Sequence, residues 1–268
     1  MHTHGIRATR LTIAGLPLAS RLHPSTPDAL LGHLRWCLAT PYAEAWGLFR
    51  NDELLALATL VHFGNSARVG CFHASHPLCD VAQQQLLVNE LLRSVEARGC
   101  ATLTVQVPPK DMDFWKGCGF TEIGAFITYA NGNFLEATRD EVALMQPAHT
   151  LALLHLDQHA TGEDRRTLLL EHHFAAHAYV VDGRVRGALL PLLGNGSIVA
   201  DDPAVGLELQ RWLLPTQHRI TVPETNSAAC EHLLDRDYDA MGTSVRMVWG
   251  SAPAFNADMV FAWPWGTP

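Results

Sequence analysis

The sequence feature that most constrains the fold is a layout of elements that occurs twice along the 268 residues. Each copy begins with a predicted hairpin, turned by Asn51-Asp52 in the first copy and by Asp182-Gly183 in the second. Asn, Asp and Gly tolerate the positive φ angles of tight turns, so these pairs between apolar runs predict two-stranded hairpins. The repetition predicts two domains of similar size, which we place at residues 1–140 and 141–268.

After each hairpin, the same order of strand, helix, strand and short helix follows. In the first copy we expect a helix at residues 81–98, a strand at 101–107 and a last helix that closes at Gly119-Phe120. In the second copy the helix covers residues 203–214, and the unit closes at Asp237-Tyr238. These patterns predict an α/β protein of the α+β type, with mixed, mostly antiparallel sheets.

Composition restricts the partners and the compartment. The net charge is −8, and the chain has two lysines and no Lys/Arg cluster, so we expect no binding to nucleic acid or to an anionic membrane surface. No apolar run is long enough to span a membrane, and Gly15 and Pro17 interrupt "LTIAGLPLAS", which we interpret as a first strand and loop. Six cysteines without CxxC spacing are typical of free thiols in a reducing cytoplasm.

The strand-helix-strand-helix unit resembles the GNAT superfamily of acyl-CoA-dependent N-acetyltransferases. In the first half the resemblance rests on the aromatic pair Phe114-Trp115, three residues before Gly119-Phe120. In the second half, "DQHATGEDRRTLL", "VPETNSAACEHLL" and "TSVRM" occur in the order found in the C-terminal domain of bacterial tandem-GNAT proteins. The resemblance implies two tandem GNAT-like domains and transfer of an acyl group from acetyl-CoA, or another acyl-CoA, to a small-molecule amine.

The CoA-binding loop of that family lies between a strand and a helix, where backbone N–H groups hold the pyrophosphate. The resemblance places this contact at Val81, Ala82 and Gln83 in the first half, and at Asp202 and Ala204 in the second. None of these residues is a glycine, although glycines let phosphate oxygens approach the backbone.

Both loops also carry an acidic residue at the start of the helix. Asp80 and Gln83 have capping-box spacing, and Asp202 before Pro203 has the pattern of an N-cap followed by a first-turn proline. We therefore expect each helix to be capped by its own side chains, with a carboxylate that repels pyrophosphate by about 1 kcal/mol or more. The alternative is that the loops bind CoA through backbone amides, with the carboxylates turned to solvent.

Candidate catalytic residues are few. Many GNAT enzymes use a tyrosine of the last helix to reprotonate the leaving thiolate, but the aligned residues here are Trp115 and Leu233. Trp115 either packs against the pantetheine arm or fills the core. His73 and His76 lie on the strand beside the expected pantetheine site and are candidate bases near neutral pH. They are three residues apart, so at most one faces the cleft, and a structural role is the alternative.

Two arginines of the second half are candidate substrate-binding residues. Asp157 and Arg165 either pair across the turn at Gly162, or Arg165 projects into a cleft and binds a carboxylate. Arg246 lies on an apolar strand and needs an anionic partner, which an acidic group of its own chain can supply. Asn226 is expected to cap the last helix.

The sequence leaves two functions open. The first is an N-acyltransferase with one working cleft and one structural cleft. The second is a catalytically inactive protein of the same fold that binds a small metabolite, which the missing glycines, the capping aspartates and the absent tyrosines favour. The histidines show no metal-ligand spacing, so no metal site is expected. We expect a monomer or a homodimer.

Overall fold

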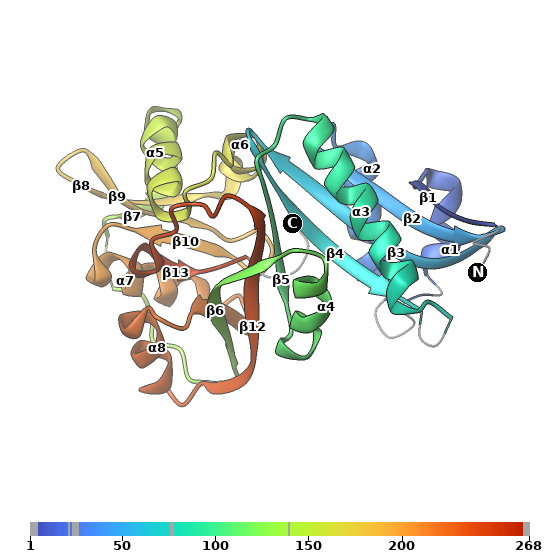
Figure 1. Ribbon diagram of the computed structural model, residues 1–268. Helices are drawn as coiled ribbons and strands as arrows, with labels where there is room; N and C mark the ends of the chain where they lie inside the picture. The colour runs from blue at the N-terminus through green and yellow to red at the C-terminus, as the bar shows by residue number, and fades with distance from the viewer. Residues whose placement is uncertain (1–4, 21, 23–26, 76–77, 139, 265–268) are drawn as a thin grey trace.

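The structure is a computed structural model that describes residues 5–20, 22, 27–75, 78–138 and 140–264. Its strands form an eight-stranded and a five-stranded sheet (Figure 1). In spatial order, the larger sheet consists of β1 (Ile6–Arg10), β2 (Ala43–Arg50), β3 (Glu53–Phe63), β4 (Ser66–Ala74), β5 (Thr102–Val107), β12 (Asp239–Gly250), β6 (Thr121–Ala130) and β11 (Arg219–Pro223). The smaller sheet consists of β13 (Val260–Ala262), β10 (Ser197–Ala200), β9 (Arg184–Leu190), β8 (His177–Val181) and β7 (Val142–Leu144).

Among the strands described, β4 and β5 form the one parallel pair, and the other pairings are antiparallel. The expected class, with mixed and mostly antiparallel sheets, is confirmed. The longer helices are α2 (Pro27–Ala39), α3 (Val81–Ala97), α5 (Thr150–Thr161), α7 (Pro203–Leu213) and α8 (Ser227–Leu234). The short helices are α1 (Leu16–Ala19), α4 (Met112–Gly117) and α6 (Arg166–His172), with 3-10 turns at Ile13–Gly15, Pro109–Asp111, Pro147–His149, His173–Ala175 and Ala257–Met259.

One local expectation is wrong. The segment "LTIAGLPLAS" does not hold the first strand, which ends before it at Arg10. It forms the 3-10 turn and α1 instead. Pro17 lies in the first turn of α1, where its missing N–H has no intrahelical acceptor to lose, so the proline favours a helix start here.

The predicted repeat is confirmed in the order of the elements. Hairpin β2–β3 is followed by β4, α3, β5, α4 and β6, and hairpin β8–β9 by β10, α7, β11, α8 and β12. The hairpin turns have the expected left-handed backbone, with φ of 55° at Asn51, 50° at Asp182 and 73° at Gly183. In the first half α3 and α2 cover opposite faces of the sheet (Figure 1).

The last strands of the two halves are exchanged. β12, which ends the second copy of the layout, lies between β5 and β6 of the first copy. β6 in turn pairs with β11 of the second copy. Figure 1 shows β12 beside β5 and β6 at the centre of the molecule. Each half thus supplies a strand that pairs with strands of the other half. The domain boundary between residues 140 and 141 stays a prediction.

The chain after β12 adds one further strand to the second half. β13 pairs with β10, where Ile198 lies opposite Ala262. On its other side, the backbone N–H of Trp263 donates to the Thr221 carbonyl of β11 at 2.7 Å. β13 therefore lies between β10 and β11.

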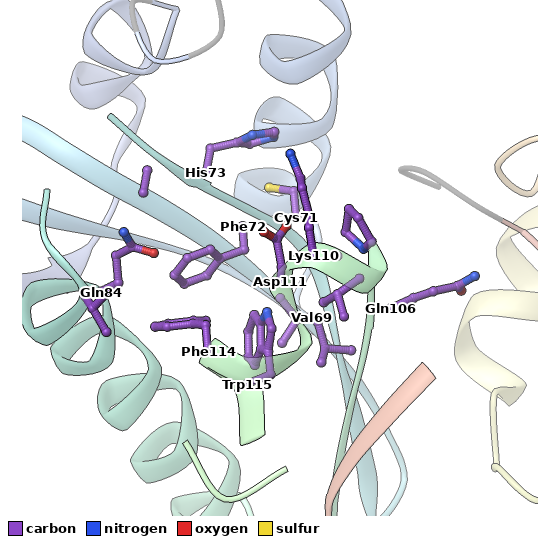
Figure 2. A pocket seen from close by; sticks show the side chains of 16 residues that line it. Val69, Cys71, Phe72, His73, Gln84, Gln106, Lys110, Asp111, Phe114 and Trp115 are labelled. Carbon is purple, nitrogen blue, oxygen red and sulfur yellow. The ribbon is translucent and has the colours of Figure 1, made fainter. Parts of the chain in front are cut away.

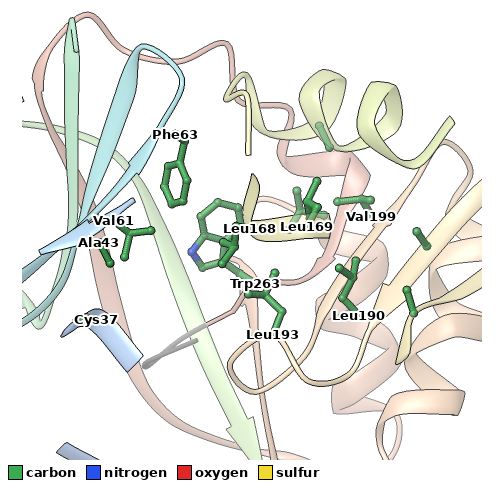
Figure 3. Close-up of a cluster of buried hydrophobic side chains, with 14 of the residues drawn as sticks. Cys37, Ala43, Val61, Phe63, Leu168, Leu169, Leu190, Leu193, Val199 and Trp263 are labelled. Carbon is green, nitrogen blue, oxygen red and sulfur yellow. The ribbon is translucent and has the colours of Figure 1, made fainter. Parts of the chain in front are cut away.

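The two halves share a hydrophobic core on the face of the first sheet opposite α3. Trp263 lies in this core, between Val61 and Phe63 of the first half and Leu168 and Leu193 of the second (Figure 3). Its side chain is 2% exposed. Burying an indole and the aliphatic side chains around it contributes several kcal/mol and holds the halves in one orientation.

Candidate functional site

The candidate site is the gap where β4 and β5 separate. The two strands pair only from Ser66 to Arg68 on β4, and then diverge. A bulge lies directly after this point, because Ala58 and Leu60 of β3 pair with Phe72 and Val69 across a register shift. A bulge bends its strand and ends regular pairing, so it accounts for the separation.

Thr59 and Gly70 hold the bulge. The Thr59 hydroxyl accepts a hydrogen bond from the Cys71 backbone N–H at 2.9 Å and lies 2.8 Å from Nε2 of His33. A Cβ atom on Gly70 would lie 2.7 Å from that same hydroxyl oxygen, so the position has no room for a side chain. Beyond Arg68 the backbone of β4 no longer pairs with β5.

Cavity 1 occupies the gap on the side of α3 and α4 and has a volume of about 490 Å³. Its walls are β4 from residue 69 to 74, β5 from 105 to 107, the start of α3 and the start of α4. Figure 2 shows Phe72, Phe114 and Trp115 side by side in it, with His73 pointing away from these rings. An unpaired strand edge beside aromatic rings suits an extended ligand that carries amides.

Trp115 fills the core, as one of the two expected roles requires, and it also lines cavity 1. It is 2% exposed and packs edge-on against Phe120 with ring centroids 4.9 Å apart, so it belongs to the core. It also contacts Phe72 and Phe114 in the wall of cavity 1. Neither the indole nor the neighbouring phenyl rings can donate a proton to a thiolate.

The predicted capping box at the start of α3 is confirmed. The Gln83 N–H donates to the Asp80 carboxylate at 2.8 Å, and the Asp80 N–H donates to the Gln83 side chain at 3.2 Å. The first-turn amides of Val81 and Ala82 have no intrahelical acceptor, by the geometry of a helix start. Arg50 lies beside them and donates to the Leu78 carbonyl at 3.1 Å. The loop therefore combines one carboxylate with two N–H groups and one guanidinium.

The corresponding helix of the second half, α7, also begins with an aspartate cap. The Ala204 N–H donates to the Asp202 side chain at 2.8 Å, as expected, and Arg186 holds Asp201 through a side-chain hydrogen bond of 2.8 Å. The gap between β10 and β11 is filled by β13, whereas the gap between β4 and β5 is open. Leu233, the residue aligned with Trp115, is fully buried.

Cavity 2 lies on the opposite side of the same gap and has a volume of about 380 Å³. It shares β4 residues 69–73 with cavity 1, and also Gln106, Pro108 and Asp111. Its other walls come from both halves, with Phe63 and Arg68 from the first and Leu168 from the second. The two cavities thus approach each other from the two faces of the sheet.

His73 lines both cavities, whereas His76 lies outside the described residues. The pKa of His33 is lowered to about 4, first by burial and second by the neighbouring His73. Cys71 also lines both cavities, and burial raises its pKa to about 11, so it is a neutral thiol at pH 7. Of the titratable groups at the gap, His73 has the chemistry of a base near neutral pH.

Arg165 and Arg246 both have partners within the chain. The turn at Gly162, with φ of 70°, returns the chain so that Arg165 pairs with Asp157, with 3.0 Å between Nε and Oδ2. Arg246 lies 3.0 Å from the Glu163 carboxylate. Both arginines are buried, and neither lines cavity 1 or cavity 2. The structure favours the intrachain alternative for both.

The polar residues of the gap that sequence reasoning missed include Arg68, Gln106, Lys110 and Asp111. Arg68 carried a usable signal, since it is an arginine within the apolar strand "SARVGCF", as Arg246 is within its own strand. The other three follow or end a strand, where polar residues are common and indicate little. Within the described residues, no cluster of three or more His, Cys, Asp or Glu side chains has metal-binding geometry, and none of the helices has the length and hydropathy of a membrane span.

Comparison with known proteins gives fold neighbours. No protein-family model matches the sequence, and no curated protein matches it. A proposed acetyltransferase from Pyrococcus horikoshii superposes with a TM-score of 0.83 at 16% identity, covering 98% of this chain and 95% of the other. A GCN5-related N-acetyltransferase from Sphaerobacter thermophilus has a TM-score of 0.65 at 14% identity, covering 96% of this chain and 100% of its own.

The third neighbour bears on the repeat. It is a tandem GNAT protein from the clavulanic acid biosynthesis pathway, with a TM-score of 0.60 at 13% identity, and the match covers 93% of this chain and 99% of the other. At such identities the likeness concerns the fold. Because it extends over both halves, the chain has the tandem GNAT fold.

Proposed function

We propose that the chain is an N-acyltransferase whose acyl-CoA site is cavity 1 and whose acceptor amine enters through cavity 2. The observation that carries this proposal is the β4–β5 gap itself, which has a cavity on each face and His73 in the walls of both. A donor and an acceptor that approach from opposite faces can meet there without competing for space.

The residues of cavity 1 fit an acyl-CoA in two respects. The edge of β4 beyond Arg68 offers backbone amides that an extended pantetheine can pair with, as in strand addition. Phe72 and Trp115 provide an apolar wall for its alkyl segments. When bound, the thioester supplies an activated acyl group. The polar groups for the pyrophosphate are the amides of Val81 and Ala82 together with Arg50.

His73 is the proposed base. It lies where both cavities meet, and a neutral imidazole can accept a proton from an amine near pH 7. Among the described residues, no tyrosine lines either cavity, so neither wall supplies a phenol to protonate the leaving sulfur. We therefore expect slow turnover.

A second function is favoured by one specific observation, the capping box at Asp80. In that proposal the chain is a GNAT-like protein that binds a metabolite in cavity 2 without acyl transfer. The carboxylate of Asp80 lies at the helix start where a pyrophosphate would bind, and it already accepts the hydrogen bond from Gln83. The two proposals differ in whether CoA binds.

Calorimetric titration of acetyl-CoA into the native protein and into Asp80→Asn tests this difference. Asparagine caps a helix as well as aspartate does, so the variant removes the charge and keeps the cap. We expect weak binding by the native protein and about fivefold tighter binding by Asp80→Asn, the equivalent of about 1 kcal/mol. Asp202→Asn is the matched control and should change nothing, because β13 fills the gap of the second half.

The outcomes separate the two functions. Binding that tightens in Asp80→Asn alone supports an acyl-CoA site at cavity 1. Absence of binding in the native protein, in Asp80→Asn and in Asp80→Gly would contradict the acyltransferase and leave the metabolite-binding protein. An equal gain in Asp202→Asn would contradict the placement of the site in the first half.

A further inference from the structure

Three arginines surround one tryptophan at the junction of the two halves. The guanidinium carbons of Arg68, Arg165 and Arg246 lie 4.6, 5.2 and 4.9 Å from the ring centroid of Trp263. The arginines come from three distant parts of the chain, namely β4, the start of α6 and β12. A tryptophan ring attracts cations by its negative face, but it does not neutralise their charge.

The carboxylates of this cluster do not balance its charge. Asp157 is engaged by Arg165 through both of its oxygens. Glu163 lies between the other two arginines, 3.0 Å from Arg246 and 3.6 Å from Arg68. Three guanidinium groups face two carboxylates, so one positive charge is left over in a buried region. An uncompensated charge in such surroundings costs several kcal/mol.

Arg68 is the arginine with the weakest pairing. Its distance of 3.6 Å to Glu163 exceeds that of a hydrogen bond, and its Nη2 atom is buried without a hydrogen-bond partner among the described residues. Burial lowers the pKa of both Arg68 and Arg246. Because Arg68 lies farther from Glu163 than Arg246 does, the leftover charge is assigned to Arg68.

Arg68 is also the one member of the three that reaches a cavity. Its side chain is 16% exposed, and it lines cavity 2, whereas Arg165 and Arg246 do not. The wall beside Arg68 is apolar at Val61, Phe63 and Leu168, and polar at His73, Gln106 and Asp111. A forked cation next to an apolar surface suits one carboxylate, which guanidinium can bind through two parallel hydrogen bonds.

We propose that cavity 2 binds an apolar amine that carries a carboxylate, the simplest being an apolar amino acid, and that Arg68 binds the carboxylate. A monoanion neutralises the cluster, whereas a phosphate dianion would exceed its charge. The apolar body then contacts the walls of cavity 2. The fate of the amine, which is acylation at the gap, rests on the proposed function, but the binding of the carboxylate does not.

The test compares two ligands that differ in the carboxylate. L-phenylalanine and L-phenylalaninamide are titrated by calorimetry into the native protein, Arg68→Lys and Arg68→Met, without CoA. We expect the native protein to bind the acid at least tenfold more tightly than the amide. Arg68→Met should lose this preference, and Arg68→Lys should keep part of it, because lysine retains the charge and loses the fork. L-leucine and its amide repeat the comparison with a smaller side chain.

The fold of the variants is checked by thermal unfolding. Arg68→Met should retain the melting temperature of the native protein, since it removes one of three mutually repelling charges. If Arg68→Met melts at a lower temperature, the ligand preference is judged from Arg68→Lys. The proposal is overturned if the native protein binds acid and amide equally, if the preference survives in Arg68→Met, or if neither amino acid binds. A carboxylate preference in a protein that binds no CoA would refute the acyltransferase and retain this site.

Discussion

The molecule has two gaps between strands, at equivalent positions of the repeat, and the gaps differ in what occupies them. Between β4 and β5 the gap is open on both faces, with a cavity on each. Between β10 and β11 it is filled by β13, which hydrogen-bonds on both sides. The helix that connects the two strands of each gap is capped by an aspartate, α3 by Asp80 and α7 by Asp202. The two gaps therefore differ in the added strand and not in the presence of a capping aspartate.

The residues that directly follow β13 also contribute to the gap between β4 and β5. Trp263, which follows β13 directly, packs against Arg68, a residue of cavity 2. Pro264, next in the chain, lines the same cavity. The closing segment of the second half thus forms part of the wall of cavity 2. The comparison predicts large structural effects at the filled gap and small ones at the open gap.

Trp263→Ala should have the largest effect. It removes the ring that contacts both halves and three guanidinium groups, and replacing a buried tryptophan by alanine costs about 3–5 kcal/mol. Urea unfolding would measure the loss. Trp212→Ala, at a ring that is 36% exposed, is the matched control and should cost less than about 1 kcal/mol. Similar losses in the two variants would contradict the central role of Trp263.

The helix caps of the two halves should rank next. Asn226 accepts a hydrogen bond from the Ala229 N–H at 3.0 Å and donates one to the Val260 carbonyl of β13 at 3.0 Å. Asn226→Ala therefore removes the cap of α8 and leaves a buried carbonyl without this donor. We expect a loss of about 2–4 kcal/mol. Asp80→Ala, at an exposed cap, should cost about 1 kcal/mol. Equal values from chemical denaturation would show that β13 does not depend on Asn226.

The pH dependence of stability allows a further comparison, between one buried histidine of each half. Burial lowers the pKa of both His33 and His232 to about 4. Each is neutral when folded and gains a proton on unfolding below about pH 6.5, so its contribution to stability is complete above pH 6.5 and is lost as the pH falls toward 4.

Unfolding free energies measured between pH 7.5 and 4.5 test this assignment. His33→Gln and His232→Gln should each flatten the decline by up to about 1.4 kcal/mol per pH unit. The exposed His218 supplies a control, since His218→Gln should leave the profile unchanged. A profile in which neither buried histidine matters would place the acid sensitivity of the fold elsewhere.

Local features of the fold were predictable from the sequence because their causes are local. The hairpin turn at Asn51 depends on the backbone angle of that residue itself. The caps at Asp80, Asp202 and Asn226 each join a side chain to a backbone N–H within three residues. The need of Arg246 for an acidic partner also followed from its apolar strand, and Glu163 supplies it. Such patterns do not depend on which strand lies beside which.

The features that require distant pairing were not predictable in the same way. The exchange of β6 and β12 depends on strand partners more than a hundred residues apart, and an alternating apolar pattern fits many partners equally well. The insertion of β13 between β10 and β11 was not predictable from local patterns either. The role of Arg68 depends on three segments that meet only in the folded chain.

The exchange of β6 and β12 has a genetic consequence. Two copies of a gene that trade their last strands need equal amounts of both products, and each product alone would expose a sheet edge open to pairing with the wrong neighbour. Encoding both copies in one reading frame fixes their ratio at one to one and makes the proper partner the nearest one. Once the two copies are linked in one chain, either copy can lose its ligand site and still be retained. Its last strand is still needed to complete the sheet of the copy that keeps a ligand site.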